Sequence, residues 1–475
     1  MAQPNIVAAS GQQIDAFHAS IAVFGAKRLI MIAAFFSKTV HSVTGAVRTF
    51  CDDWSALGLR YAVRAASDRF VARWSTARHG IRRRVMRQTV NSPSSIASPG
   101  LKRGILFVGY VEAALGLGES LRGLIAAYAT TGEPFAILPF NRGVETRHLG
   151  QFMPEAYDFS NRYDLVVIEV AVDQLPIVFE TIDPRLFAGA RIALRTYWEL
   201  PQAPKEWASI LAKADEIWAP NAFVANAFRD IFEGRIVVVP PCVEPETINL
   251  PSLERFGFDK GRFNFLFTFD FFSFPARKNP LGVIEAFRRA FPIGSENVGL
   301  VIKSTGNPAR YPEVARAFRT AIRRDKRIAV IDGDMSRKDI HGLIAGCDAY
   351  VSLHRAEGFG FGMAEAMFFE KPVIGTAYSG NTEFLNDETG FPVAYALRAV
   401  NPDEYVWSTG QTWAEPNLNS AVAMLQAVFS DPDNAKRVAA AGSAFIRTHH
   451  SYSAVGAVVS MQLERIISAR QANVD

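Results

Sequence analysis

Residues 349–367 read AYVSLHRAEGFGFGMAEAM and form the most informative stretch of the chain. It opens with a short apolar run, 349–353, which predicts a buried strand. A turn containing Gly358, Gly360 and Gly362 follows, and the apolar residues after it predict a helix. Bare backbone amides at such a turn, with a helix dipole behind them, form a ready site for the phosphates of a nucleotide.

Glu365 stands out within the predicted helix, because it is the only ionisable residue in 358–369. It shares a helical face with Phe361, Phe368 and Phe369, so the helix does not resemble a solvated surface helix. A buried and unpaired carboxylate is costly, and a partner is therefore expected. Sugar or ribose hydroxyls are suitable donors, and a neighbouring Arg is the structural alternative.

Strand-like and helix-like segments alternate on the N-terminal side of this stretch. Such alternation predicts parallel sheets with helices on both faces. The first series consists of expected strands at 105–111, 135–139, 164–170, 191–197, 216–218 and 236–239, with a helix at 118–129. The second series consists of expected strands at 263–267, 298–303, 327–331 and 349–353, with helices at 280–290, 311–323 and 336–345.

The two series predict two doubly wound, Rossmann-like domains, at 101–245 and 246–440, because 475 residues exceed what one ordinary core covers. The Ser-, Pro- and Gly-rich end of segment 1–100 reads as a linker after a basic helical extension. Helices in 441–475 are expected to pack back on the first domain. Ligands lie outside the carboxyl ends of strands in open sheets, so the loops after Leu353 and Phe269 should line the site.

Basic residues are concentrated in the extension, since residues 1–103 contain 15 Lys or Arg and 4 acidic residues, against a net charge of +4 for the whole chain. Two interpretations fit this pattern: a basic amphipathic helix in peripheral contact with a membrane surface, and a solvated helical extension. Nucleic acid is not an expected partner, because no base-stacking motif accompanies the charge.

Cysteine usage and the lack of a secretory signal predict a cytoplasmic protein. If it contacts a membrane, we expect it to lie peripherally on the inner face. Cys51, Cys242 and Cys347 are far apart and lack metal-ligand spacing, which is typical of reduced thiols. The apolar stretch 21–36 is interrupted by Lys27 and is too short to cross a bilayer comfortably.

Glu357 and Glu365 are separated by seven residues, and this spacing resembles the E-x7-E motif of glycosyltransferase family 4. The segments KPVIGT (371–376) and SGNTE (379–383) continue the match at the family's spacing. Upstream, ARKNP (276–280) resembles the family's basic phosphate-binding loop. The resemblance covers roughly 104–440, and its C-terminal half is the specific part.

The resemblance implies an α/β protein of the GT-B fold, with two facing Rossmann-like domains. It implies transfer of a hexosyl group from a nucleoside-diphosphate sugar, with retention of configuration, to a glycan or lipid-linked glycan acceptor in bacterial surface polysaccharide synthesis. No cofactor and no metal are implied.

The resemblance also implies roles for individual residues. Glu357 would hold sugar hydroxyls, and Glu365 would hold the ribose. Arg277 and Lys278 would neutralise the diphosphate leaving group. The donor-binding turn that assists them consists of Gly358, Phe359, Gly360 and Phe361.

A second glycine-rich loop, with Gly116 and Gly118, follows the first expected strand and resembles the loop by which these enzymes approach donor phosphate and acceptor. Easing of a strand-to-helix turn is an equal alternative. The loop is not a G-x-G-x-x-G fingerprint, because position 121 is Leu.

Two departures from the family pattern matter. The aromatic stretch 269–275 replaces the usual Gly-Arg pair before the basic loop, so the pairing of basic residues with phosphates is open. The place of a common histidine reads RTYWELP (195–201). There Trp198 and Glu199 fit either an acceptor pocket or a strand end.

Asp332 and Asp334 mimic a metal-binding D-x-D motif. We interpret them as turn residues, because they precede Ser336, which reads as a helix cap. His354 lies three residues before Glu357, and we interpret it as structural, because no carboxylate or serine is expected to pair with it. Two alternatives to the transferase remain: another enzyme of the same fold, such as a sugar-nucleotide epimerase or phosphorylase, and an inactive sugar-nucleotide-binding protein.

Overall fold

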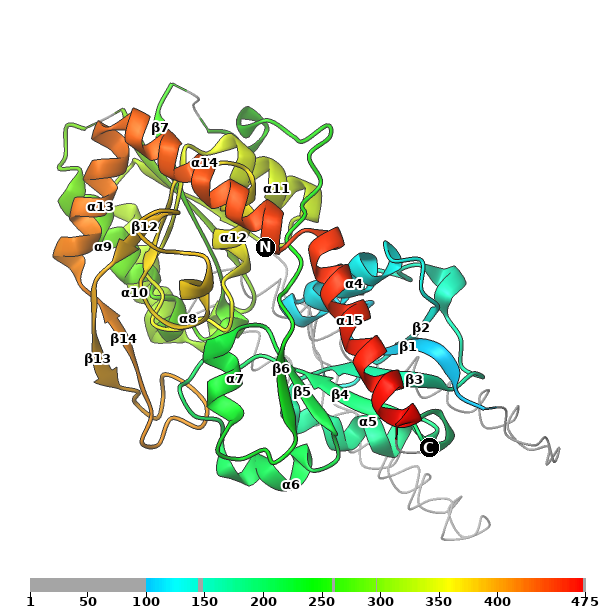
Figure 1. Ribbon diagram of the computed structural model, residues 1–475. Coiled ribbons are helices and arrows are strands. Elements are labelled where there is room, and N and C mark those ends of the chain that lie inside the picture. The colour runs from blue at the N-terminus through cyan, green and yellow to red at the C-terminus, as the bar shows by residue number, and fades with distance from the viewer. Residues whose placement is uncertain (1–99, 144–147, 259–260, 296, 473–475) are drawn as a thin grey trace, which may run out of the picture. The chain divides into compact units, whose positions relative to one another are not determined.

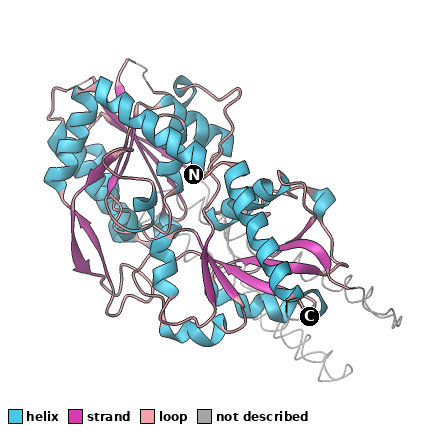
Figure 2. Ribbon diagram, in the orientation of Figure 1, coloured by secondary structure: helices cyan, strands magenta, loops and turns pink. Residues whose placement is uncertain are grey.

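The computed structural model describes residues 100–143, 148–258, 261–295 and 297–472 (Figure 1). The predictions for the basic extension and for nearly all of its linker fall on residues 1–99 and lie outside this part of the chain. The described residues form two six-stranded sheets and a two-stranded hairpin. Helices flank the strands of both larger sheets (Figure 2), as the alternating pattern predicts.

The first sheet is parallel throughout and has the order β2-β1-β3-β4-β5-β6. Its inner strands form because their apolar runs are buried on both faces, as in Ile105–Val108, which is fully covered, whereas the edge strand β6 is only partly covered. The strands are β1 (Lys102–Gly109), β2 (Phe135–Pro139), β3 (Tyr163–Glu169), β4 (Arg191–Arg195), β5 (Glu216–Ala219) and β6 (Arg235–Val238).

Helices pack on the first sheet through apolar faces. The helix α4 (Gly116–Ala129) follows β1, and the C-terminal helix α15 (Tyr452–Gln471) lies beside it (Figure 1). Leu124 of α4 and Val459 of α15 belong to one buried cluster with Phe107 of β1. The remaining α-helices of this half are α5 (Leu175–Thr181), α6 (Ala208–Leu211) and α7 (Ala222–Phe228).

The second sheet is also parallel and has the order β12-β11-β10-β7-β8-β9. Its strands are β7 (Phe263–Asp270), β8 (Val298–Thr305), β9 (Ile328–Asp332), β10 (Ala349–Ser352), β11 (Val373–Thr376) and β12 (Phe391–Val393). Its α-helices are α8 (Pro275–Lys278), α9 (Pro280–Ala290), α10 (Pro312–Arg323), α11 (Arg337–Gly346), α12 (Phe361–Phe368), α13 (Leu418–Ser430) and α14 (Pro432–His449).

The sequence did not predict the antiparallel hairpin of β13 (Tyr395–Ala399) and β14 (Thr412–Pro416). Most of β13 is exposed, so the strand lacks the apolar alternation by which a half-buried strand is found. Ion pairs hold the hairpin instead, because Glu415 accepts hydrogen bonds from Arg355 and Arg398.

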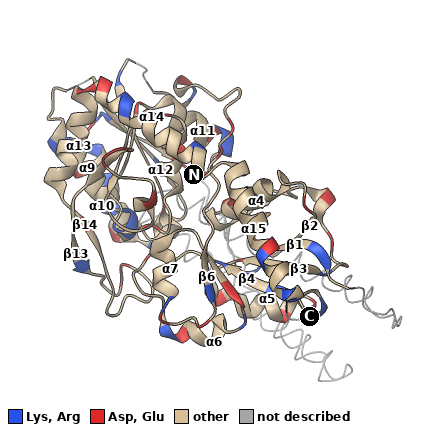
Figure 3. Cartoon of the chain, in the orientation of Figure 1, with Lys and Arg blue, Asp and Glu red and all other residues tan. Residues whose placement is uncertain are grey.

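Charged residues of both signs are interspersed over the described chain (Figure 3). The two described cysteines, Cys242 and Cys347, are buried and unbridged. None of the helices within the described ranges combines the length and the apolar character needed to cross a bilayer.

Candidate functional site

The glycine-rich turn crosses the carboxyl edge of the second sheet, between the end of β10 at Ser352 and the start of α12 at Phe361. Gly360 has a φ of +100°, and a Cβ there would lie 2.5 Å from the Met363 methyl carbon, so the turn needs glycine at this point. Phe359 is buried against Phe384 and His450. The predicted strand, turn and helix therefore form one anchored unit.

Glu357 lies in this turn and is almost completely buried. Its Oε2 accepts a hydrogen bond of 3.0 Å from Arg277, and its Oε1 accepts one of 2.5 Å from Lys278. Its backbone N–H donates to Ser379 Oγ at 2.8 Å, and its carbonyl accepts from the Gly380 N–H at 2.9 Å. Burial alone would raise the pKa of Glu357, but the two cations lower it to about 2, so this carboxylate is ionised near neutral pH.

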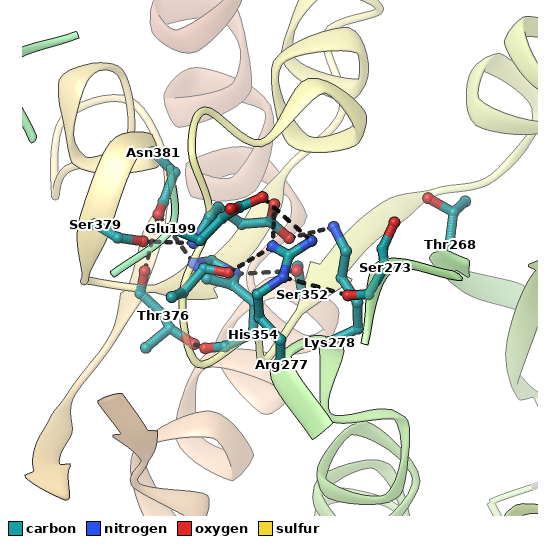
Figure 4. Close-up of polar contacts among 12 residues, drawn as sticks. Glu199, Thr268, Ser273, Arg277, Lys278, Ser352, His354, Thr376, Ser379 and Asn381 are labelled. Carbon is teal, nitrogen blue, oxygen red and sulfur yellow. Dashed lines mark hydrogen bonds and ion pairs between the residues drawn. The ribbon is translucent and has the colours of Figure 1, made fainter. Parts of the chain in front are cut away.

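Arg277 is buried, and protein groups surround its guanidinium (Figure 4). Its Nε donates to the Ser273 carbonyl at 3.3 Å, and its Nη1 donates to the Ala356 carbonyl at 2.8 Å as well as to Glu357. Its Nη2 lies 3.7 Å from Glu199 Oε1. Arg277 is thus fixed by three carbonyl or carboxylate groups within the hydrogen-bonding range and by a fourth just beyond it.

Lys278 differs from Arg277, because its side chain is 19% exposed and its ammonium group donates a hydrogen bond to Glu357. Burial lowers its pKa, and Glu357 opposes that effect. The backbone after it is held by Asn279, which has a φ of +54°, caps α9 through the Gly282 N–H and donates to the Leu353 carbonyl. The basic loop is therefore tied to the end of β10, and Lys278 is its more accessible cation.

His354 lies behind Glu357 and is fully buried. Its Nδ1 lies 3.1 Å from Ser352 Oγ, and its Nε2 lies 2.9 Å from Asn381 Oδ1. Burial lowers the pKa of the imidazole. The Ser352 contact shows that the expectation of no serine partner for His354 was wrong. Both contacts hold the buried imidazole in place, so they still fit a structural role.

Glu365 projects from α12 and is buried, as its apolar helical face predicts. It forms an ion pair with Arg337 at the start of α11. Burial raises the pKa of Glu365 above its usual value, and Arg337 offsets part of this increase. Of the two partners expected for this carboxylate, the arginine is therefore present. A ligand hydroxyl could bind Glu365 only together with Arg337.

The first-sheet glycines differ from one another. A Cβ on Gly118 would lie 2.5 Å from the Ala113 carbonyl oxygen and 2.6 Å from the Tyr110 carbonyl oxygen, whereas a Cβ on Gly116 would meet no atom within 4 Å. Gly118 is thus needed for the turn into α4. The next residue, Glu119, lies 3.2 Å from Arg337, which brings this loop to the surroundings of Glu365.

Asp332 and Asp334 follow β9. Asp332 accepts a hydrogen bond from Ser304 Oγ, and Asp334 accepts one from Thr305 Oγ1, both at 2.9 Å. Ser336 caps α11 by accepting from the Asp339 N–H, which confirms the predicted cap. Over the described ranges, no cluster of three or more His, Cys, Asp or Glu residues is placed to hold a metal ion.

Three residues of the site escaped the sequence argument. Asn221 caps α7 and also donates to the carbonyls of Gly358 and Gly380. The Tyr197 ring lies beside Gly358 and 6.3 Å from the Phe361 ring. The Tyr405 hydroxyl donates to Glu199 at 2.6 Å. Only the N-cap preference of Asn carried a local signal, because the other contacts join segments that are distant in sequence.

Trp198 and Glu199 separate into two roles. Trp198 is 4% exposed and packs against Trp207 and Tyr405, so it belongs to the core at the strand end. Glu199 is partly exposed and lies beside Arg277, so it belongs to the site.

A known protein family matches the segment of the chain that contains most of the site residues. Residues 273–407 match the family model described as glycosyl transferases group 1. This segment contains Arg277, Lys278, Glu357 and Glu365.

Three solved structures resemble the chain at low sequence identity. Anabaena Alr3699/HepE in complex with UDP and glucose is 15% identical with a TM-score of 0.55, and the match covers 76% of this chain and 99% of that one. Sucrose-phosphate synthase from Thermosynechococcus elongatus is 14% identical with a TM-score of 0.57, covering 78% and 100%. A glycosyltransferase from Rickettsia africae is 16% identical with a TM-score of 0.54, covering 78% and 99%. At these identities the likeness shows the fold, which is GT-B.

Proposed function

We propose that this chain is a retaining glycosyltransferase that resembles family 4 and moves a hexosyl group from a UDP- or GDP-sugar to a glycan or lipid-linked glycan. One observation carries the proposal: Glu357 meets Lys278 and Arg277 beside a glycine-rich turn, in a segment that matches glycosyl transferases group 1. A carboxylate and two cations at the edge of a parallel sheet suit a ligand with both hydroxyl and phosphate groups.

Lys278 and Arg277 act differently on the donor in this proposal. Lys278 is the more accessible cation, so it contacts the diphosphate, and the phosphate oxygens compete with Glu357 for its ammonium group. Arg277 stays bonded to Ala356 and Glu357 and stabilises the developing negative charge of the leaving group from a fixed position. This division is our proposal for the pairing that the basic loop alone leaves open.

The two glutamates address different parts of the donor. Glu357 accepts hydrogen bonds from sugar hydroxyls, and Glu365 accepts them from the ribose. Backbone amides of the turn 358–361 meet the phosphates. Gly116 offers an open backbone position, which supports the approach of the donor phosphate or the acceptor there.

The proposed reaction needs no protein nucleophile. The bond between the sugar carbon and the leaving phosphate oxygen breaks, and the acceptor oxygen forms its new bond on the same face of the sugar. The acceptor hydroxyl proton passes to the departing diphosphate. Positive charge from Lys278 and Arg277 makes this diphosphate a better leaving group without a metal ion.

Two alternatives use the same fold. A sugar-nucleotide epimerase or phosphorylase would act on a similar ligand, and an inactive protein would bind a sugar nucleotide without turnover. The spacing of Glu357 and Glu365 argues against the first alternative, and the presence of Glu357, Glu365 and Lys278 argues against the second. The setting that we propose is the cytoplasm, with peripheral membrane contact through the basic extension and a role in bacterial surface polysaccharide synthesis.

Ligand-induced thermal stabilisation tests the proposal. UDP, GDP, UDP-glucose and GDP-mannose are compared, and we expect one nucleotide and its sugars to raise the Tm. A ligand at 100 times its Kd adds about 2.7 kcal/mol. The release of free nucleotide from the selected donor is then measured, with Lys278→Met as the matched loss-of-function variant. No stabilisation by any nucleotide would reject the donor site, and stabilisation without turnover on any acceptor or on water would favour the inactive binding protein.

A further inference from the structure

Arg337 connects two carboxylates on different helices, Glu119 of α4 beside the first sheet and Glu365 of α12 beside the second. It is the first residue of α11, and its Nη2 pairs with the buried Glu365 of α12. Its Nε lies 3.2 Å from Oε1 of Glu119 on α4, and Arg122 of α4 donates to the other oxygen of Glu119 at 2.8 Å. Four charged groups of alternating sign therefore run from the first-sheet glycine loop to the helix that follows the glycine-rich turn.

The accessibility of these groups is unequal. The Glu365 side chain is 7% exposed, whereas the Arg337 side chain is 39% exposed. Arg337 therefore covers a buried anion while keeping part of its own side chain in contact with solvent. An ion pair with a purely structural role does not need an exposed partner. Here Arg337 is partly exposed, so a ligand can approach the pair from the side of the guanidinium.

Glu365 needs this cation to stay ionised. Burial of a carboxylate disfavours its charged form, and an adjacent guanidinium restores it. An ionised carboxylate only accepts hydrogen bonds, and it accepts them from hydroxyl groups more strongly than its protonated form does. Losing the guanidinium would therefore weaken Glu365 as an acceptor without moving its backbone.

We propose that Arg337 is a positioning residue for nucleotide binding: it keeps Glu365 ionised and aimed at the ribose, and it links this part of the donor site to α4 through Glu119. The inference rests on the proposed function, because it deepens the role given to Glu365. It also explains why an arginine partner and a ligand for Glu365 are compatible.

Other groups around Glu365 do not replace Arg337. His341 of α11 lies 3.0 Å from Arg337 Nη2, and burial lowers its pKa to about 4, so it is neutral near pH 7. Tyr350 of β10 has its pKa raised by burial and is neutral as well. Arg447 of α14 stacks on Phe368 and donates to its carbonyl. The packed strand β11 carries no titratable side chain, and Glu119 is an anion that opposes ionisation of Glu365.

The dissociation constants of UDP and GDP measured from pH 5.5 to 8 test this role. Arg337→Met, Arg337→Lys and the wild-type full chain are compared by calorimetry, and the ratio of variant to wild type cancels the titration of the phosphates. We expect Arg337→Met to bind within about threefold of wild type at pH 8 and at least about tenfold more weakly at pH 5.5, because Glu365 takes up a proton. Arg337→Lys should restore most of the affinity at pH 5.5.

Lys338→Met is the matched control, because Lys338 is the next residue of α11 and pairs with Glu246 instead. It should leave the pH profile of binding unchanged. Glu119→Gln removes an anion that opposes ionisation of Glu365 and leaves the pair with Arg337 in place, so it should not reproduce the loss of affinity at low pH expected of Arg337→Met. A shift in the Glu119→Gln profile as large as that of Arg337→Met would contradict the assignment to Glu365.

The outcomes separate this inference from the proposed function. A wild-type chain that binds neither UDP nor GDP rejects the nucleotide site itself. A wild-type chain that binds a nucleotide, with an Arg337→Met variant that binds it equally at all pH values, rejects the role of Arg337. An equal loss of affinity at every pH, not rescued by Lys, also rejects it, since a structural defect would act in this way. Far-ultraviolet circular dichroism confirms that each variant is folded.

Discussion

Glu199 follows strand β4 of the first sheet, and Arg277 lies in α8, which follows strand β7 of the second sheet. Glu199 Oε1 lies 3.7 Å from Arg277 Nη2. The other terminal nitrogen of the same guanidinium binds Glu357, and the Tyr405 hydroxyl binds the other oxygen of Glu199. One arginine thus stands between a carboxylate that follows β4 and the carboxylate of the glycine-rich turn. A change at Glu199 should therefore reach Glu357 through Arg277.

Glu199→Gln tests this relationship. Removing the negative charge of Glu199 leaves Glu357 as the carboxylate that pairs with Arg277. Exposed or partly exposed ion pairs typically contribute about 0.2–1 kcal/mol. We expect kcat to fall by about two- to fivefold while the affinity for free UDP or GDP stays at the wild-type value. Tyr405→Phe, which removes a hydrogen bond but no charge, is the control and should have a smaller effect on kcat. An equal fall in nucleotide affinity would place Glu199 at the nucleotide instead.

The low pKa of Glu357 predicts a pH dependence of stability. A carboxyl whose pKa is lowered from 4.5 to about 2 by folding stabilises the protein above pH 4.5, and this contribution is lost as the pH falls towards 2. The contribution is on the order of 3 kcal/mol. The free energy of unfolding of Glu357→Gln, measured with urea, should therefore fall less steeply than that of wild type between pH 5 and pH 3. Parallel slopes would contradict the ion pair with Lys278 and Arg277.

Metal independence is a separate prediction. The diphosphate charge is assigned to Lys278, Arg277 and backbone amides, and Asp332 and Asp334 are assigned to the turn after β9. An excess of chelator should leave turnover of the selected donor nearly intact. The control is Asp334→Asn, which should keep wild-type turnover. An activity that is abolished by chelator and restored by manganese would show that the D-x-D pattern binds a metal ion, contrary to this prediction.

Deletion of residues 1–98 tests the membrane assignment of the basic extension. Binding to vesicles of anionic lipid depends on the net positive charge and on buried apolar surface, so the shortened chain should be released from such vesicles. Its donor turnover should persist, because the site residues all lie beyond residue 98. Full vesicle binding by the shortened chain would assign the membrane contact elsewhere or favour the solvated extension.

Local patterns explain how much of the fold was predictable. Buried parallel strands such as β7 and β10 are continuous apolar runs, and the glycines of 358–362 mark the turn, so these elements follow from neighbouring residues alone. The exposed strand β13 gives no such signal, because ion pairs rather than apolar burial hold it. The register between strands could not be predicted from the sequence either, because it depends on partner strands far along the chain.

Several residues of the candidate site were named from the sequence, but the contacts between them were not. Glu357, Lys278 and Arg277 were identified as a set, and the structure brings them into contact. The partners Glu199 and Arg337 lie 78 and 28 residues away from Arg277 and Glu365 respectively, and no spacing rule joins them. Folding of two sheets is what brings these charges together.

Glu357→Gln and Glu365→Gln should separate sugar recognition from nucleotide recognition. Glu357 holds Lys278 at 2.5 Å, so its neutralisation frees the ammonium group for phosphate. Free UDP or GDP should then bind Glu357→Gln at least as tightly as wild type, while affinity for the sugar donor and turnover are lost. Glu365→Gln should weaken both free nucleotide and donor, because losing a hydrogen bond to a charged group costs about 1.5–3 kcal/mol, or on the order of 10- to 150-fold in affinity. Calorimetry with UDP, GDP and the selected donor measures both effects, and Glu370→Gln, which follows α12, is the control. If both variants fold and bind nucleotide and donor as the wild type does, neither glutamate belongs to the donor site.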